Sequence, residues 1–185
     1  MSFQIRSISL YSHAGDRRDI LFKLGEVNII TGASKTGKSS LIEIVDYCLG
    51  SSQCEIPYGV IRDTVSWCGV LFETKEDLFF VARRLPDKGR ETCGDYYFEL
   101  GKSLPIPDYF SLRPTINDDS LQIVLNKLTG IGDNIHIPDE QHARRALRAN
   151  IRHALFFCYQ KQTEISSNSN LFHKQDRAFI MQTIK

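Results

Sequence analysis

Apolar and polar residues alternate along much of the first hundred positions, and this pattern predicts β-strands. Phe3–Tyr11 shows the two-residue period of a strand with one buried face, and Asp19–Lys23 resumes an extended pattern after a polar turn. Thr64–Glu73 and Leu78–Leu85 are apolar runs separated by four polar residues, which predicts a β-hairpin. Tyr96–Leu100 is a further candidate strand.

Helical spacing of apolar residues predicts three helices. Ser40–Leu49 is mostly apolar, and Gly50 directly after it favours the end of a helix. Apolar residues return every three or four positions in Ser120–Leu128 and in the longer Gln141–Tyr159. Strands combined with helices in this way predict an α/β fold.

A short run of β-branched residues, Val27–Ile30, predicts a buried strand immediately before a glycine-containing loop. The loop, Gly32–Ser39, reads Gly-Ala-Ser-Lys-Thr-Gly-Lys-Ser and matches the phosphate-loop pattern G-x-x-x-x-G-K-[ST]. The helix predicted over Ser40–Leu49 follows it. Strand, glycine loop and helix are the context that this motif requires, so the sequence predicts a nucleoside triphosphate site.

The chemistry of the motif assigns a role to each of its positions. Gly32 and Gly37 let the backbone pass close to phosphate oxygens, where a Cβ would collide. Lys38 places an ammonium between the β- and γ-phosphates and is the first candidate catalytic residue, while the Ser39 hydroxyl ligates Mg²⁺. The other candidate nucleotide contacts, which offer mainly backbone amides, are Ser34, Lys35, Thr36 and Ser40.

Composition narrows the class of protein. The chain has 185 residues and a net charge of +1, which excludes a polybasic nucleic-acid binder. No apolar run is long enough to span a bilayer, and we expect no membrane partner. The five cysteines are an odd number and contain no C-x-x-C pair, which indicates reduced thiols and a cytoplasmic location.

The residues around the motif resemble the ATP-binding-cassette (ABC) ATPases. Phe22–Gly32 is similar to the family's approach to the phosphate loop, [LF]-x-x-G-x-x-x-x-I-x-G. Ile5–Leu10 and Gly37–Glu43 resemble the DNA-repair and chromosome-maintenance branch, which includes the SMC proteins, RecN and RecF. This resemblance implies a P-loop NTPase fold: an ABC N-terminal lobe with a mixed sheet around the phosphate-loop helix and an antiparallel β portion.

Two further residues are assigned by the same resemblance. Leu155–Gln162 looks like the family's Q-loop, whose glutamine contacts Mg²⁺ and the water near the γ-phosphate; Gln160 is the first candidate and Gln162 the second. Lys161 stands where the family usually has glycine. Arg62 occupies a place where some SMC-like heads carry an arginine that reaches nucleotide or DNA, and a solvated loop arginine is the alternative interpretation.

The resemblance also implies an organisation and a function. Residues 1–165 would form the first lobe, and residues 166–185 a tail at the place where a coiled-coil arm begins in long-armed members. The L-S-G-G-Q signature, the Walker B strand and the switch histidine of the second lobe are absent from the sequence. We therefore expect MgATP binding, dimerisation with a second lobe or a second copy, and slow turnover by this chain alone.

The resemblance implies that ATP-driven opening and closing acts on DNA or accessory proteins, in DNA maintenance, repair or defence. A narrower resemblance points to ABC ATPases of bacterial multi-component anti-phage systems. Two alternatives remain. A self-contained P-loop kinase of a small molecule or nucleotide fits the length of the chain, although the loop follows two extended segments instead of the first strand. A non-catalytic nucleotide-sensing module would bind ATP without turnover.

Overall fold

The computed structural model describes residues 3–34, 36–132, 135–136 and 147–159. The chain forms two compact units, Met1–Leu121 and Gln122–Lys185. The first unit contains a five-stranded sheet and the phosphate-loop motif, so the site is built within it.

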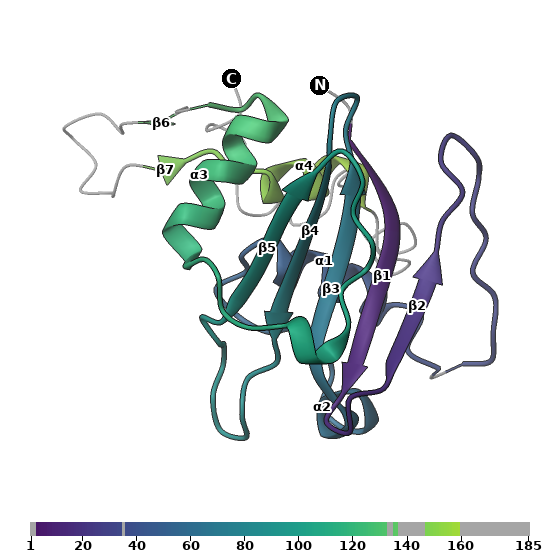
Figure 1. The fold of residues 1–185 in the computed structure, drawn as a ribbon. Coiled ribbons are helices and arrows are strands. Elements are labelled where there is room, and N and C mark those ends of the chain that lie inside the picture. Colours follow the sequence, from purple (N-terminus) through teal and green to yellow (C-terminus); the bar gives the residue numbers. More distant parts are fainter. Residues whose placement is uncertain (1–2, 35, 133–134, 137–146, 160–185) are drawn as a thin grey trace, which may run out of the picture. The chain divides into compact units, whose positions relative to one another are not determined.

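The first unit is organised around an antiparallel sheet with the strand order β2-β1-β3-β4-β5 (Figure 1). The strands are β1 (Gln4–Ser12), β2 (Arg17–Leu21), β3 (Val65–Glu73), β4 (Leu78–Arg84) and β5 (Tyr96–Gly101). All four neighbouring pairs are antiparallel. The predicted first strand, the β3–β4 hairpin and the strand beginning at Tyr96 are confirmed.

Both faces of the central strand β3 are covered, which is why eight of its nine residues are buried. Helix α1 (Ser40–Cys48) packs on the face that carries Cys68, since the Cys48 and Cys68 sulfur atoms lie 3.7 Å apart. The opposite face carries Trp67 and Phe80, and residues 104–112 pack against it. Figure 1 shows this segment crossing the strands.

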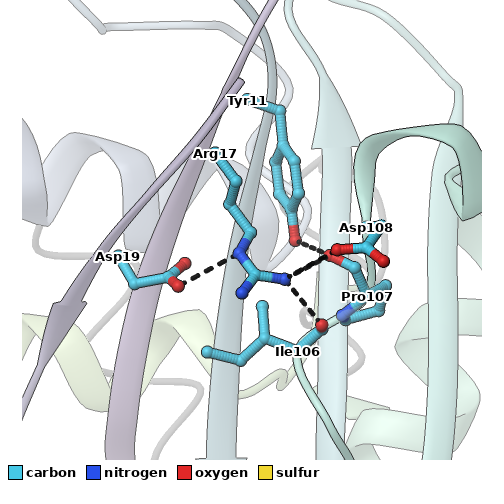
Figure 2. Close-up of polar contacts among 6 residues, drawn as sticks. All are labelled: Tyr11, Arg17, Asp19, Ile106, Pro107 and Asp108. Carbon is cyan, nitrogen blue, oxygen red and sulfur yellow. Dashed lines mark hydrogen bonds and ion pairs between the residues drawn. The ribbon is translucent and has the colours of Figure 1, made fainter. Parts of the chain in front are cut away.

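The segment that covers the second face is tied to β1 and β2 by polar contacts (Figure 2). The Arg17 guanidinium donates to the carbonyl oxygens of Ile106 at 2.8 Å and Pro107 at 3.2 Å. The Tyr11 hydroxyl donates to the same Pro107 oxygen at 2.9 Å. Asp19 orients Arg17 through a 3.0 Å ion pair. A segment with no strand or α-helix of its own is thereby fixed as part of the core.

The helices agree with the sequence pattern in part. Helix α1 ends beside Leu49 and Gly50 as expected, and α3 (Asp118–Thr129) covers the predicted Ser120–Leu128. The Asn117 side chain caps α3 by accepting the Ser120 N–H at 2.9 Å. The short elements that the pattern did not predict are α2 (Val60–Thr64), η1 (Tyr109–Ser111), β6 (Ile135–His136) and β7 (Leu147–Arg148).

The expected buried strand over Val27–Ile30 is wrong. These residues form no strand, and Val27 and Ile29 are 89% and 81% exposed. The Asn28 side chain bonds both the N–H and the carbonyl of Lys23, which holds the chain in a turn. No described strand pairs with this segment, so its β-branched residues lack the neighbouring strand that would cover them.

The expected mixed sheet is wrong for the same reason. A mixed sheet needs a parallel strand, and the segment that would have supplied one lies outside the sheet. The five-stranded sheet of the first unit is antiparallel throughout. The antiparallel β portion and the α/β character are confirmed.

The expected long helix Gln141–Tyr159 is also wrong in its described part. Leu147–Arg148 is a strand paired with β6, and helix α4 covers only Arg152–Cys158. The Asn150 side chain accepts the Arg152 N–H at 3.1 Å, which favours a helix start at this point over a continuous helix. Residues 141–146 lie outside the described part of the chain.

Candidate phosphate-binding site

The glycines of the loop occupy backbone conformations that favour glycine. Gly37 has a φ of 84°, in the left-handed region. A Cβ there would also lie 3.4 Å from Ile61 Cδ1 of α2, so helix α2 lies against the loop. At Gly32 a Cβ would lie 3.3 Å from the Thr36 hydroxyl oxygen. Both glycines therefore lie where the protein itself leaves little room for a side chain, and their approach to phosphate stays a prediction.

The Lys38 ammonium lies inside the loop and closes it. It donates to the carbonyl oxygens of Gly32 at 2.7 Å and Ala33 at 2.6 Å, and to the Thr36 hydroxyl at 3.1 Å. All three acceptors are neutral. No ion pair among the described residues involves Lys38. The loop thus holds a positive charge with no carboxylate partner in the described part of the chain.

Backbone N–H groups add to this positive character. Helix α1 begins at Ser40, and its N-cap residue Ser39 makes no side-chain cap bond. The N–H groups of Gly37, Lys38 and Ser39 donate to no backbone carbonyl of the described residues, whereas Ser40 N–H bonds Gly37 O at 3.0 Å. Unbonded N–H groups at the positive end of a helix favour binding of an anion.

The predicted site residues fall into three groups. The structure brings Gly32, Thr36 and Lys38 together by direct contacts, and Gly37 lies between Thr36 and Lys38 in the chain. Ser34 and Ser39 are exposed in the same loop, while Ser40 is buried at the start of α1. Lys35, Gln160, Gln162 and the tail 166–185 lie outside the described residues, so their roles stay predictions.

Metal-ligating side chains do not cluster in the described part of the chain. It contains no group of three or more His, Cys, Asp or Glu residues able to hold a metal ion. The motif assigns the Ser39 hydroxyl to Mg²⁺, and Ser39 is exposed in the loop. A magnesium ion held by one hydroxyl takes its remaining oxygen ligands from phosphate and water.

Arg62 lies in α2, beside the loop, but its side chain is bonded to backbone. It donates to the Ile56 carbonyl at 2.8 Å and to the Cys54 carbonyl, and its guanidinium lies 4.2 Å from the centre of the Tyr58 ring. The sequence argument did not single out Tyr58. Tyr58 lies in the turn before α2, so no helical spacing in the sequence linked it to Arg62.

The far end of α1 is capped by a buried arginine. Arg83, which is 3% exposed, donates to the carbonyls of Tyr47 at 2.9 Å and Ser51 at 2.7 Å. A cation at a helix C-terminus complements the helix dipole. Its guanidinium also lies over the Tyr47 ring at 4.0 Å. Burial raises the pKa of the Tyr47 hydroxyl, with a smaller opposing effect from Arg83.

Comparison with known proteins adds no relative. No family model matches the chain, and no curated protein matches it significantly. The part of the chain that the structure describes has no helix long and apolar enough to cross a membrane. The case for a function therefore depends on the geometry of the loop.

Proposed function

We propose that Gly32–Ser39 binds the phosphates of MgATP and that the chain acts as the first lobe of an SMC/RecN-like ABC-type ATPase head. The observation that carries the proposal is the Lys38 ammonium, held by neutral oxygens at 2.6 to 3.1 Å. Beside it, at the start of α1, lie N–H groups that donate to no backbone carbonyl of the described residues. A polyphosphate is the ligand whose charge and oxygen geometry fit this arrangement.

Each group of the loop would bind a different part of the triphosphate. The backbone N–H groups of Gly37, Lys38 and Ser39 would surround one phosphate, and the Lys38 ammonium would bridge the next two. The Ser39 hydroxyl would hold Mg²⁺, which neutralises charge on the phosphates during transfer. Positioning of the attacking water falls to Gln160 by family resemblance.

Exposed apolar residues next to the loop favour a lobe over a self-contained kinase. Val27, Ile29 and Ile30 are 89%, 81% and 44% exposed and lie within a dozen residues of Lys38. Contiguous exposed apolar residues mark surfaces that a partner covers. A second ATPase lobe or a second copy of the chain is the partner that we propose, and DNA or accessory proteins would respond to its movement.

Lys38→Ala is the direct test of nucleotide binding. Loss of one charge-assisted hydrogen-bonding group is expected to weaken MgATP binding by about 10- to 150-fold in titration calorimetry. Lys23→Ala is the matched control, because Lys23 is 79% exposed and forms an ion pair with Glu26 in the segment before the loop. An unchanged MgATP affinity in Lys38→Ala would contradict the proposal that the loop binds the nucleotide.

Turnover distinguishes the proposed lobe from the kinase. We expect slow or no ATP hydrolysis by the purified chain, since no second-lobe motif is present in the sequence. Rapid hydrolysis by a monomer would contradict this expectation. Phosphoryl transfer to a member of a nucleoside panel would support the kinase instead.

A further inference from the structure

Tyr58 is an aromatic residue on the surface beside the phosphate loop. It is 77% exposed and lies between α1 and α2, three residues before Ile61, the residue that lies against Gly37. We propose that Tyr58, supported by Arg62, is the platform on which the base of the bound nucleotide stacks. This inference rests on the proposed function, because it concerns the same ligand.

The Tyr58 ring is held in place although it is exposed. The Arg62 guanidinium covers one face of the ring at 4.2 Å from its centre. The guanidinium is itself fixed by the carbonyls of Ile56 and Cys54, and both of these residues have buried side chains. An aromatic ring fixed before binding loses little conformational entropy when a ligand stacks on it.

The ring lies within reach of the phosphate loop. Three peptide units separate Tyr58 from Ile61, so their Cα atoms are at most about 11 Å apart. An extended nucleoside triphosphate places its base at a comparable distance from its terminal phosphates. The backbone beside the ring is open, since a Cβ built on Gly59 would meet no atom within 4 Å. Because Tyr58 itself is 77% exposed, a base that leaves the loop toward α2 can reach the ring.

This arrangement gives Arg62 a different role from the one that the family resemblance suggested. Its guanidinium N–H groups donate to backbone carbonyls, so the side chain supports the aromatic ring instead of binding a phosphate. Stacking on a tyrosine accepts every base, because each base has a π-face. The platform thus adds affinity for the nucleoside part of the ligand, with preference for the larger purine rings.

Comparison of ATP with inorganic tripolyphosphate tests the platform. Tyr58→Ala in the full chain is expected to weaken MgATP binding by about 5- to 150-fold, the range for loss of one base–aromatic stack. Magnesium tripolyphosphate, which has no base, should bind the variant and the wild type equally. Tyr58→Phe should retain wild-type affinity for both ligands. Phe110→Ala is the matched control, since Phe110 is 88% exposed on the segment that covers the other face of the sheet.

Each result has a distinct meaning. If Tyr58→Ala binds MgATP as tightly as wild type, or loses affinity for both ligands equally, the platform is refuted while nucleotide binding stands. If the wild type binds neither MgATP nor magnesium tripolyphosphate, the proposed function is refuted, and the platform with it. Lys38→Ala should weaken both ligands, which separates the phosphate contacts from the base contact.

Discussion

Arg83 shows at the scale of one residue how the helix after the phosphate loop is held. Its guanidinium bonds the carbonyls of Tyr47, Ser51 and Cys93 and the Thr92 hydroxyl. No carboxylate among the described residues forms an ion pair with it. The buried charge is instead satisfied by backbone oxygens and by two aromatic faces. It therefore fixes the C-terminal end of α1 to the sheet.

Replacement of Arg83 by methionine should destabilise the protein strongly. Three backbone carbonyls lose a buried donor at roughly 1 kcal/mol or more each, so the free energy of unfolding should fall by about 3 kcal/mol or more in urea titration. Arg84→Met is the control: its partner Asp95 is at 2.7 Å, but both side chains are more than a third exposed. It should cost about 1 kcal/mol or less. Equal losses in the two variants would contradict this account.

At the scale of the element, the segment 104–112 takes the place that a helix would occupy on the second face of the sheet. Its apolar residues pack on Trp67 and Phe80, and Arg17 and Tyr11 bond its carbonyls (Figure 2). Irregular backbone can be part of a core only when its polar groups find such partners. The pattern of apolar residues did not identify this segment as part of the core because prolines interrupt it.

Arg17→Ala should release this segment. Loss of the charged donor to Ile106 and Pro107 is expected to cost about 1–2 kcal/mol of unfolding free energy, and to speed amide hydrogen exchange in residues 104–112. Arg18→Ala is the control, since Arg18 is an exposed neighbour in the same strand for which no side-chain bond within the described residues is seen. Unchanged exchange in Arg17→Ala would show that apolar packing alone holds the segment.

At the scale of the whole first unit, three buried tyrosines link its layers. The hydroxyls of Tyr11, Tyr47 and Tyr96 donate to Pro107 O, Arg84 O and an Asp118 carboxylate oxygen, respectively. Burial is the main cause that raises the pKa of each hydroxyl well above the ordinary value of 10.0. The folded state therefore binds these protons more tightly than the unfolded state does.

The pKa shifts predict alkaline unfolding. Below pH 10 these tyrosines are protonated in both states, so they contribute no pH dependence to the free energy of unfolding. Above about pH 10 the unfolded chain releases the protons while the folded chain retains them, and stability falls by up to about 1.4 kcal/mol per pH unit for each tyrosine. Melting temperatures measured across this range should fall steeply. Tyr47→Phe should reduce the slope, and an unchanged slope would contradict the assignment for Tyr47.

Features that local patterns encode could be predicted from the amino-acid sequence. The phosphate loop, the helix after it, the β3–β4 hairpin and the first strand all follow from motif, period and turn residues over short stretches of chain. The assignment of Lys38 to phosphate is a prediction from the spacing of the glycines, lysine and serine in the motif. The residues Gln160 and Arg62 depended on family resemblance.

Features that depend on contacts between separate segments became visible in the folded chain alone. Val27–Ile30 has the composition of a buried strand but is exposed, because strand formation requires a neighbouring strand and no described strand pairs with it. Residues 104–112 entered the core because Arg17 and Tyr11 lie opposite their carbonyls. Arg62 became the support of Tyr58 through contacts with Ile56 and Cys54. Each outcome is set by contacts between segments, and a local pattern carries no information about those contacts.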